Sequence, residues 1–168
     1  MQRPDTHEYP IYCQYAINLV GEDVLLHLRQ RQGLVADFYK SISEEKSLYA
    51  YEAGKWTIRE LMGHIIDTER ILAYRALVLA RGEQQSLPGF EEDSYVRAAR
   101  FNERTLQSLL EEFALVRAST IALVEHLRPE LHGLSGQANG HHFTVRGLCA
   151  LIAGHEHHHS NIVAERYL

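Results

Sequence analysis

Four histidines occupy five consecutive positions near the end of the sequence, in the stretch GHEHHHSNIV of residues 154–163. Imidazole nitrogens are common ligands of zinc, and the letters from His155 to His159 spell the HExxH pattern of zinc proteases. If this stretch is helical, His155 and His159 lie one turn apart on the same face, so both can reach a single ion. The spacing therefore indicates a metal site that another side chain must complete.

The protease interpretation needs Glu156 as a general base and a third ligand, which usually lies downstream. Only nine residues follow His159 and none of them is a histidine. Glu165 could serve in principle, but those nine residues leave no room for a substrate-binding subdomain. We therefore favour a site completed from another helix.

The best candidate for the third ligand is His64. A capping box at Thr57 and Glu60 begins a predicted helix that runs to about Arg81, and His64 is the only histidine within it. It borders the apolar stripe of that helix. We predict that His64, His155 and His159 hold one divalent ion and leave open positions for water or substrate, as catalytic sites do.

The other histidines fit this site less well. His158 is three residues from His155, and such a pair can also chelate. We prefer His159 because it lies on the predicted apolar stripe of the last helix, although His158 could replace or supplement it. His157 points away, and the remaining histidines lack paired spacing or lie too far along the chain: His7, His27, His126, His132, His141 and His142.

The elements that must position these residues are four long helices. Apolar residues recur at helical spacing over residues 23–42, over 57–81, from Ser94 or Asn102 to Leu127, and from Thr144 towards residue 168, whereas alternating strand patterns are absent. A glycine-rich connection covers residues 128–142. The patterns predict an all-α fold: a four-helix bundle with a long connection before the last helix, formed by residues 1–168 as a single domain.

The composition excludes several classes of protein. The 168 residues are 45% hydrophobic and carry a net charge of −5 without a basic run, so we do not expect a nucleic-acid partner. Cys13 and Cys149 are too few for a disulfide framework and favour a reducing compartment. Since no signal peptide or bilayer-length apolar run is apparent, we expect a soluble, cytoplasmic protein that does not enter a membrane.

Two stretches resemble a known family. WTIRELMGHIIDTERILAYRAL (56–77) and GHEHHHSNIVAERYL (154–168) are similar to the DinB/YfiT superfamily of metal-binding four-helix bundles, and the similarity extends from about Glu8 onward. The family takes one histidine from its second helix and an HxxxH pair from its last. By position, the resemblance implies His64, His155 and His159, the same three residues that the spacing proposes.

The resemblance also implies a range of activities. Members include transferases and isomerases that use glutathione, mycothiol or bacillithiol, proteins described as metal-dependent hydrolases, and many without an assigned activity. We therefore expect a metal-dependent enzyme, a thiol-dependent transferase or a hydrolase, that acts on a small molecule and uses Zn²⁺, or else Ni²⁺ or Fe²⁺. A low-molecular-weight thiol is a candidate cofactor and a homodimer a candidate assembly, but no residue here matches a thiol-cofactor site.

Two other classes of function compete with an enzyme. One is a non-catalytic, metal-binding stress-response module, and the other is a helical scaffold whose histidines are incidental. An open coordination position that faces a pocket would favour catalysis, whereas a closed site without a cavity would favour the module.

Catalytic residues are not assigned by the sequence. Asp67, Glu69 or Glu156 could orient a ligand imidazole or carry a proton, although an ordinary helix carboxylate is the preferred interpretation for each. Tyr74, Arg75 and Arg166 are candidates to line a substrate pocket, and no feature of the sequence selects among them.

Overall fold

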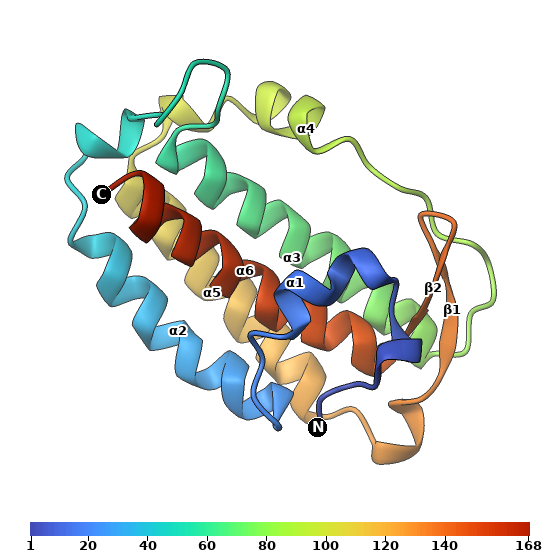
Figure 1. The fold of residues 1–168 in the computed structure, drawn as a ribbon. Coiled ribbons are helices and arrows are strands. Elements are labelled where there is room, and N and C mark those ends of the chain that lie inside the picture. The colour runs from blue at the N-terminus through green and yellow to red at the C-terminus, as the bar shows by residue number, and fades with distance from the viewer.

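Four long helices form a bundle in the computed structural model, which describes all 168 residues (Figure 1). They are α2 (Val24–Lys40), α3 (Ile58–Ala80), α5 (Leu106–Glu125) and α6 (Val145–Arg166). α3 and α2 each pack against both α5 and α6, so α2 and α3 lie diagonally opposite each other. α3 and α5 run in one direction and α2 and α6 in the other (Figure 1). The prediction of an all-α four-helix bundle is confirmed.

Threonine caps begin the two helices that carry the candidate ligands. The Thr57 hydroxyl accepts a hydrogen bond from the Glu60 amide, and the Glu60 carboxylate accepts one from the Thr57 amide, as predicted. At the start of α6, the Thr144 hydroxyl accepts from the amide of Gly147. Because these caps satisfy amides that have no partner within the helix, they fix where α3 and α6 begin.

A crossover segment, residues 81–105, returns the chain along the bundle, because α3 and α5 are parallel. It contains α4 (Glu92–Ala99) and a 3₁₀ turn, η4 (Phe101–Glu103). The predicted third helix, with its start at Ser94 or Asn102, is therefore wrong at its beginning. Arg100 has a left-handed φ of 53° that ends α4, and Thr105 caps a separate helix, α5, at Leu106.

A β-hairpin lies within the connection before α6, where no strand was predicted. β1 (Ser135–Ala138) pairs with β2 (His141–Thr144) in antiparallel register. Asn139 and Gly140 between them both have positive φ, 53° and 73°, which is the conformation that Asn-Gly turns favour. The hairpin also holds the crossover, because Leu87 exchanges backbone hydrogen bonds of 2.9 Å with Gln137 and Asn139.

The N-terminal segment covers the outer face of α6. It consists of η1 (Thr6–Glu8), η2 (Ile11–Cys13) and α1 (Gln14–Ile17). Elsewhere in the chain there are two further 3₁₀ turns, η3 (Lys46–Leu48) and η5 (Pro129–Leu131). At the closest approach, a Cβ added to Gly154 would overlap the carbonyl group of Ala16. α6 is therefore enclosed by α3, α2 and α1, which explains why most of its first half is buried.

Two apolar clusters fill the bundle, one towards each end. The first includes Leu28, Leu72 and Leu148, and the second includes Tyr39, Ile66 and Phe113. Between them lies a transverse set of buried or partly buried polar side chains, which we call the polar layer: Arg31, His64, Glu69, Arg117, His155 and Glu156. The candidate ligands thus belong to a polar level across the middle of the molecule.

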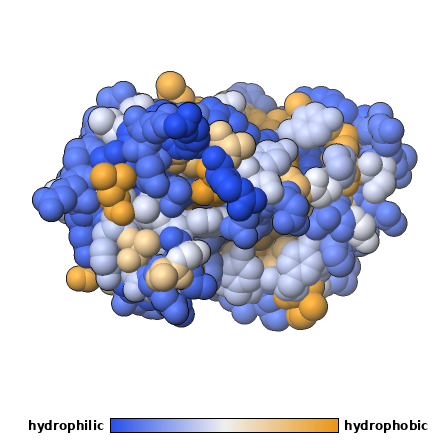
Figure 2. All heavy atoms as spheres, turned by 90° about the horizontal axis from the view of Figure 1, so that it is seen from above, coloured by the Kyte–Doolittle hydropathy of each residue, from blue (hydrophilic) through white to orange (hydrophobic).

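The surface shown in Figure 2 is mainly hydrophilic, and hydrophobic residues appear on that face as separate spots rather than as one continuous patch. No helix combines the length and the apolar character that a bilayer crossing requires.

Candidate metal centre

Three imidazoles converge where α3 and α6 cross. The Nε2 atom of His155 lies 3.1 Å from the Nε2 atoms of both His64 and His159, and one ligand nitrogen from each residue lies within 4.8 Å of the other two. Nitrogens bound at about 2.0–2.1 Å around a tetrahedral ion are about 3.3 Å apart. The spacing of these nitrogens is therefore close to what one shared ion requires.

Burial keeps all three rings neutral at physiological pH. It lowers the pKa of His64 to about 4, and burial together with the rings of His64 and His158 lowers the pKa of His159 to about 3. For His155, burial and then the rings of His159 and His64 hold the pKa well below its ordinary value. Only a neutral imidazole has a lone pair for a metal, so the cluster is in the state that binding requires.

Three residues that no sequence motif identified surround the histidine cluster. The Thr68 hydroxyl lies 3.5 Å from Nδ1 of His64, the Trp56 ring packs 4.7 Å from the His64 ring, and the Asp93 carboxylate raises the pKa of His64 against the effect of burial. Thr68 was detectable, since it is one turn from His64 on the same face. Asp93 was not, because the crossover brings it there.

The remaining histidines of the tract point elsewhere. His158 packs edge-on against Tyr15 with ring centroids 4.4 Å apart, and His157 packs 5.3 Å from His27 on α2. The geometry thus selects His159 over His158 as the third member of the cluster. His27 is partly buried, and Arg166 near the end of α6 is exposed.

The candidate carboxylates are bound to arginines rather than to the histidine cluster. Glu69 forms two hydrogen bonds of 2.8 Å with the fully buried Arg117. Glu156 accepts from Arg31 at 2.7 and 3.1 Å and from Ser160 at 2.7 Å.

Asp67, the third candidate carboxylate, lies 3.7 Å from Arg70. Since the Glu156 carboxylate is hydrogen-bonded to Arg31 and Ser160, the HExxH stretch lacks the free general base of a zinc protease.

Two hollows reach the cluster from different sides. His155 lines one of about 130 Å³, the inner cavity, which is bounded mostly by apolar side chains: Tyr12, Tyr15, Leu72, Phe90, Phe143 and Leu151. His159 lines the other, of about 310 Å³, the terminal groove, together with Trp56, Asp93 and Tyr167. Both hollows include residues of α4, so the crossover builds a wall of each.

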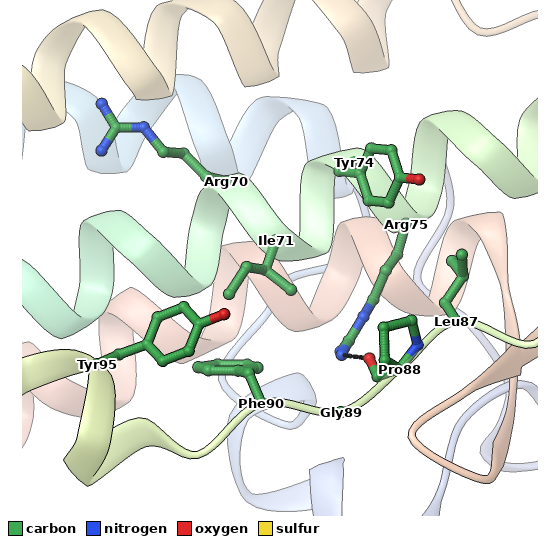
Figure 3. A pocket seen from close by; sticks show the side chains of 9 residues that line it. All are labelled: Arg70, Ile71, Tyr74, Arg75, Leu87, Pro88, Gly89, Phe90 and Tyr95. Atoms are coloured by element: carbon green, nitrogen blue, oxygen red, sulfur yellow. Dashed lines mark hydrogen bonds between the residues drawn. The ribbon is translucent and has the colours of Figure 1, made fainter.

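A third hollow, the outer pocket, has a volume of about 300 Å³ but contains no histidine. It lies on the crossover side of α3, where Tyr74 and Tyr95 flank Ile71 and Phe90 (Figure 3). Arg75 and Phe90 line both this pocket and the inner cavity. Of the three residues considered for a substrate pocket, Arg75 borders the inner cavity, Tyr74 borders only the outer pocket, and Arg166 packs on Tyr51 instead.

Comparisons with known proteins agree with this architecture. A family model described as the DinB superfamily matches residues 27–163. A protein of Oceanobacillus iheyensis named "Putative metal-dependent hydrolase OB0413" is 24% identical over 161 residues, which cover 92% of this chain and 81% of that protein. The solved structure of YfiT from Bacillus subtilis, described as "a probable metal-dependent hydrolase with an unusual four-helix bundle topology", superposes with a TM-score of 0.74. The two chains share 15% identity, and the match covers 84% of this chain and 82% of YfiT.

Proposed function

Because this chain belongs to the DinB superfamily, we propose that it is a divalent-metal-dependent enzyme for a small-molecule substrate, with His64, His155 and His159 as ligands. The observation that carries the proposal is the convergence of three neutral imidazoles between the inner cavity and the terminal groove. Hydrolysis is the leading reaction, and the metal-dependent hydrolase names of the Oceanobacillus protein and of YfiT support it.

The donor set suits a divalent ion such as Zn²⁺, Ni²⁺ or Fe²⁺. The Nε2 atoms of His64 and His159 both face Nε2 of His155 at 3.1 Å, so three lone-pair donors point at one place, where neutral rings cannot satisfy one another fully. Imidazole ligands are common to all three ions. A bound ion would supply Lewis acidity, which lowers the pKa of a nearby water to about 7 and ionises a thiol.

The surrounding residues prepare this site. Thr68 lies beside Nδ1 of His64, where its hydroxyl oxygen can accept a hydrogen bond from the tautomer that leaves Nε2 unprotonated. The Trp56 ring shields His64 from one side, and a dry surrounding strengthens charge interactions. Asp93, in the wall of the terminal groove, is the carboxylate best located to take up a proton there.

Access from two hollows favours an enzyme over a non-catalytic module, since a brace or a store needs no route for a substrate. Thiol-dependent transfer is the second candidate reaction. It is favoured by the engagement of Glu69 and Glu156 with arginines, because a thiol ionised by the metal needs no additional base.

We also propose that residues 1–168 form one domain. Its first 26 residues precede the matched region, yet α1 packs directly on α6.

The first test is elemental analysis of the protein without a histidine tag. We expect about one ion per wild-type chain, and a loss of at least tenfold in occupancy for His64→Ala, His155→Ala and His159→Ala, because each variant removes one of three ligands. His157→Ala and His158→Ala are matched controls from the same tract and should retain the ion. Wild-type occupancy in His64→Ala or His159→Ala would refute the assignment.

The second test separates the reactions. Hydrolysis of nitrophenyl esters and transfer of glutathione to chlorodinitrobenzene should be measured with the metal-loaded and the EDTA-treated protein. Metal-dependent ester hydrolysis without a thiol supports the leading reaction, and metal-dependent transfer supports the second. If bound metal changes neither rate for any substrate in a broad panel, the non-catalytic module replaces the enzyme.

A further inference from the structure

Arg75 is a buried cation without a carboxylate partner. Three arginines are buried in the protein, namely Arg59, Arg75 and Arg117. Arg59 binds the Glu44 carboxylate at 2.6 Å and Arg117 binds Glu69, whereas Arg75, which is 6% exposed, donates one hydrogen bond of 2.6 Å to the carbonyl of Pro88. No nitrogen of Arg75 is among the buried side-chain atoms without a partner, so its remaining N–H groups are open to the hollows that Arg75 lines.

The hydrogen bond to Pro88 leaves most N–H donors of the guanidinium without a protein partner and available to a ligand. The group has five N–H donors in a planar fork that matches a carboxylate or a phosphate. Figure 3 shows the Arg75 side chain extended between α3 and the crossover, with its dashed hydrogen bond to Pro88. Burial lowers the pKa of Arg75, but an arginine remains charged in a protein.

Arg75 and His155 line the same cavity. Thr68, which touches the histidine cluster, lies seven residues before Arg75, about 10 Å along the axis of α3. The inner cavity therefore joins the cluster at one end to an unpaired cation at the other. Its volume of about 130 Å³ is slightly below the roughly 150 Å³ of a cavity that holds benzene, and its rim is open at Glu92. It therefore suits a short chain, or one small ring that extends towards the rim.

We propose that the inner cavity binds its substrate as an anion, with a carboxylate or phosphate group held by Arg75 and the reacting bond directed towards the histidine cluster. This inference rests on the proposed function and adds a substrate class to it. Glu92 at the exposed rim of the cavity is the one carboxylate among the lining residues, and it makes no ion pair with Arg75. The negative charge of Glu92 repels an anion in the cavity, so a substitution of Glu92 provides a second test.

The test uses three probes of similar shape: benzoate, phenyl phosphate and the neutral benzyl alcohol. Their affinities should be measured by calorimetry on the zinc-loaded and on the EDTA-treated protein, because an anion can also bind to zinc itself. At least one anion should bind the wild-type protein about tenfold more tightly than benzyl alcohol in both forms. Tighter binding of benzoate identifies a carboxylate substrate, and tighter binding of phenyl phosphate identifies a phosphate.

Variants locate the binding group. Arg75→Gln should weaken anion binding at least tenfold without changing the affinity for benzyl alcohol. The anion affinity of Arg75→Lys should lie between those of the wild type and Arg75→Gln, since lysine keeps the positive charge but lacks the planar guanidinium. Arg70→Gln, a change of the same type at an exposed arginine outside the inner cavity, is the matched control and should bind like the wild type. Glu92→Gln should strengthen anion binding severalfold.

The outcomes separate this proposal from the metal site. Loss of metal in His64→Ala together with anion affinities that are identical in Arg75→Gln and the wild type would overturn the anion site alone. Arg75-dependent anion binding by a protein that takes up no metal would support the anion site and overturn the metal proposal. Unfolding of Arg75→Gln would be detected by circular dichroism, and the Glu92→Gln result would then decide, because unchanged anion affinity in that variant counts against the proposal.

Discussion

His155 is the residue at the centre of the histidine cluster, because its Nε2 atom is close to both other rings. The burial that keeps these rings neutral also makes the free energy of unfolding depend on pH. Folded pKa values of about 4 for His64 and about 3 for His159 lie below the value of about 6.5 expected in the unfolded chain.

At pH values between 6.5 and about 4, the unfolded chain therefore binds more protons than the folded protein, and acidification favours unfolding. We predict that the EDTA-treated protein loses stability as the pH falls from 7 to 5, by up to about 1.4 kcal/mol per pH unit for each such histidine. Urea denaturation at several pH values measures this dependence. His64→Gln removes one of the groups and should give a shallower slope; an unchanged slope would show that His64 is not held neutral by burial.

The Glu69–Arg117 pair in the polar layer gives a second prediction. Arg117→Met leaves the Glu69 carboxylate buried and unpaired, so we expect a loss of about 3–5 kcal/mol in the free energy of unfolding. Replacing both residues, as Glu69→Leu with Arg117→Met, should recover most of that loss. The control is Arg29→Met, which breaks an exposed pair with Glu125 and should cost no more than about 1 kcal/mol in urea denaturation. Equal losses for the two single variants would contradict the structural role of the buried pair.

Among the elements, α1 packs closely against α6 because Gly154 has no side chain. Gly154→Ala places a methyl group on the Ala16 carbonyl, so α1 must move and the inner cavity must open where Tyr12 and Tyr15 line it. We predict a loss of about 1–3 kcal/mol in stability, measured by urea denaturation.

Gly33→Ala in α2 is the matched control, since nothing lies within 4 Å of the added Cβ. It should stabilise the protein by about 0.5–1 kcal/mol, because alanine favours a helix. Stabilisation by both substitutions would mean that α1 is not packed tightly on α6.

The regular helices could be predicted from the sequence, whereas the crossover and the inner cavity could not. Periodicity and the caps at Thr57 and Thr144 were sufficient for α2, α3 and α6, and hence for the meeting of His64 with His155 and His159, because that geometry follows from two regular helices. The crossover was less accessible, since a left-handed turn at Arg100 divides a continuous helical pattern. The inner cavity could not be anticipated, because its wall combines residues of α1, α3, α4, α6 and the hairpin, which only tertiary packing brings together.

At the scale of the whole molecule, the histidine cluster joins helices whose ligands are 91 residues apart in the sequence. An ion bound by His64 and His155 would therefore connect α3 to α6 in the folded state only. We predict that saturating Zn²⁺, at about 100 times its Kd, stabilises the wild-type protein by about 2.7 kcal/mol through mass action. Thermal unfolding with and without the ion measures the shift. His159→Ala should lose most of it and His157→Ala should keep it, and an equal shift in both variants would indicate binding elsewhere.

The order of the helices along the chain has a consequence for how the protein is made. α6 follows every other helix in the sequence, yet it contacts α3, α2 and α1 and carries two of the three histidines of the cluster. During synthesis, the inner faces of α2 and α3 must wait for the last helix before they can be covered, and exposed apolar surface promotes aggregation. Closure of the core and creation of the ion's binding place should accordingly coincide, because both depend on α6.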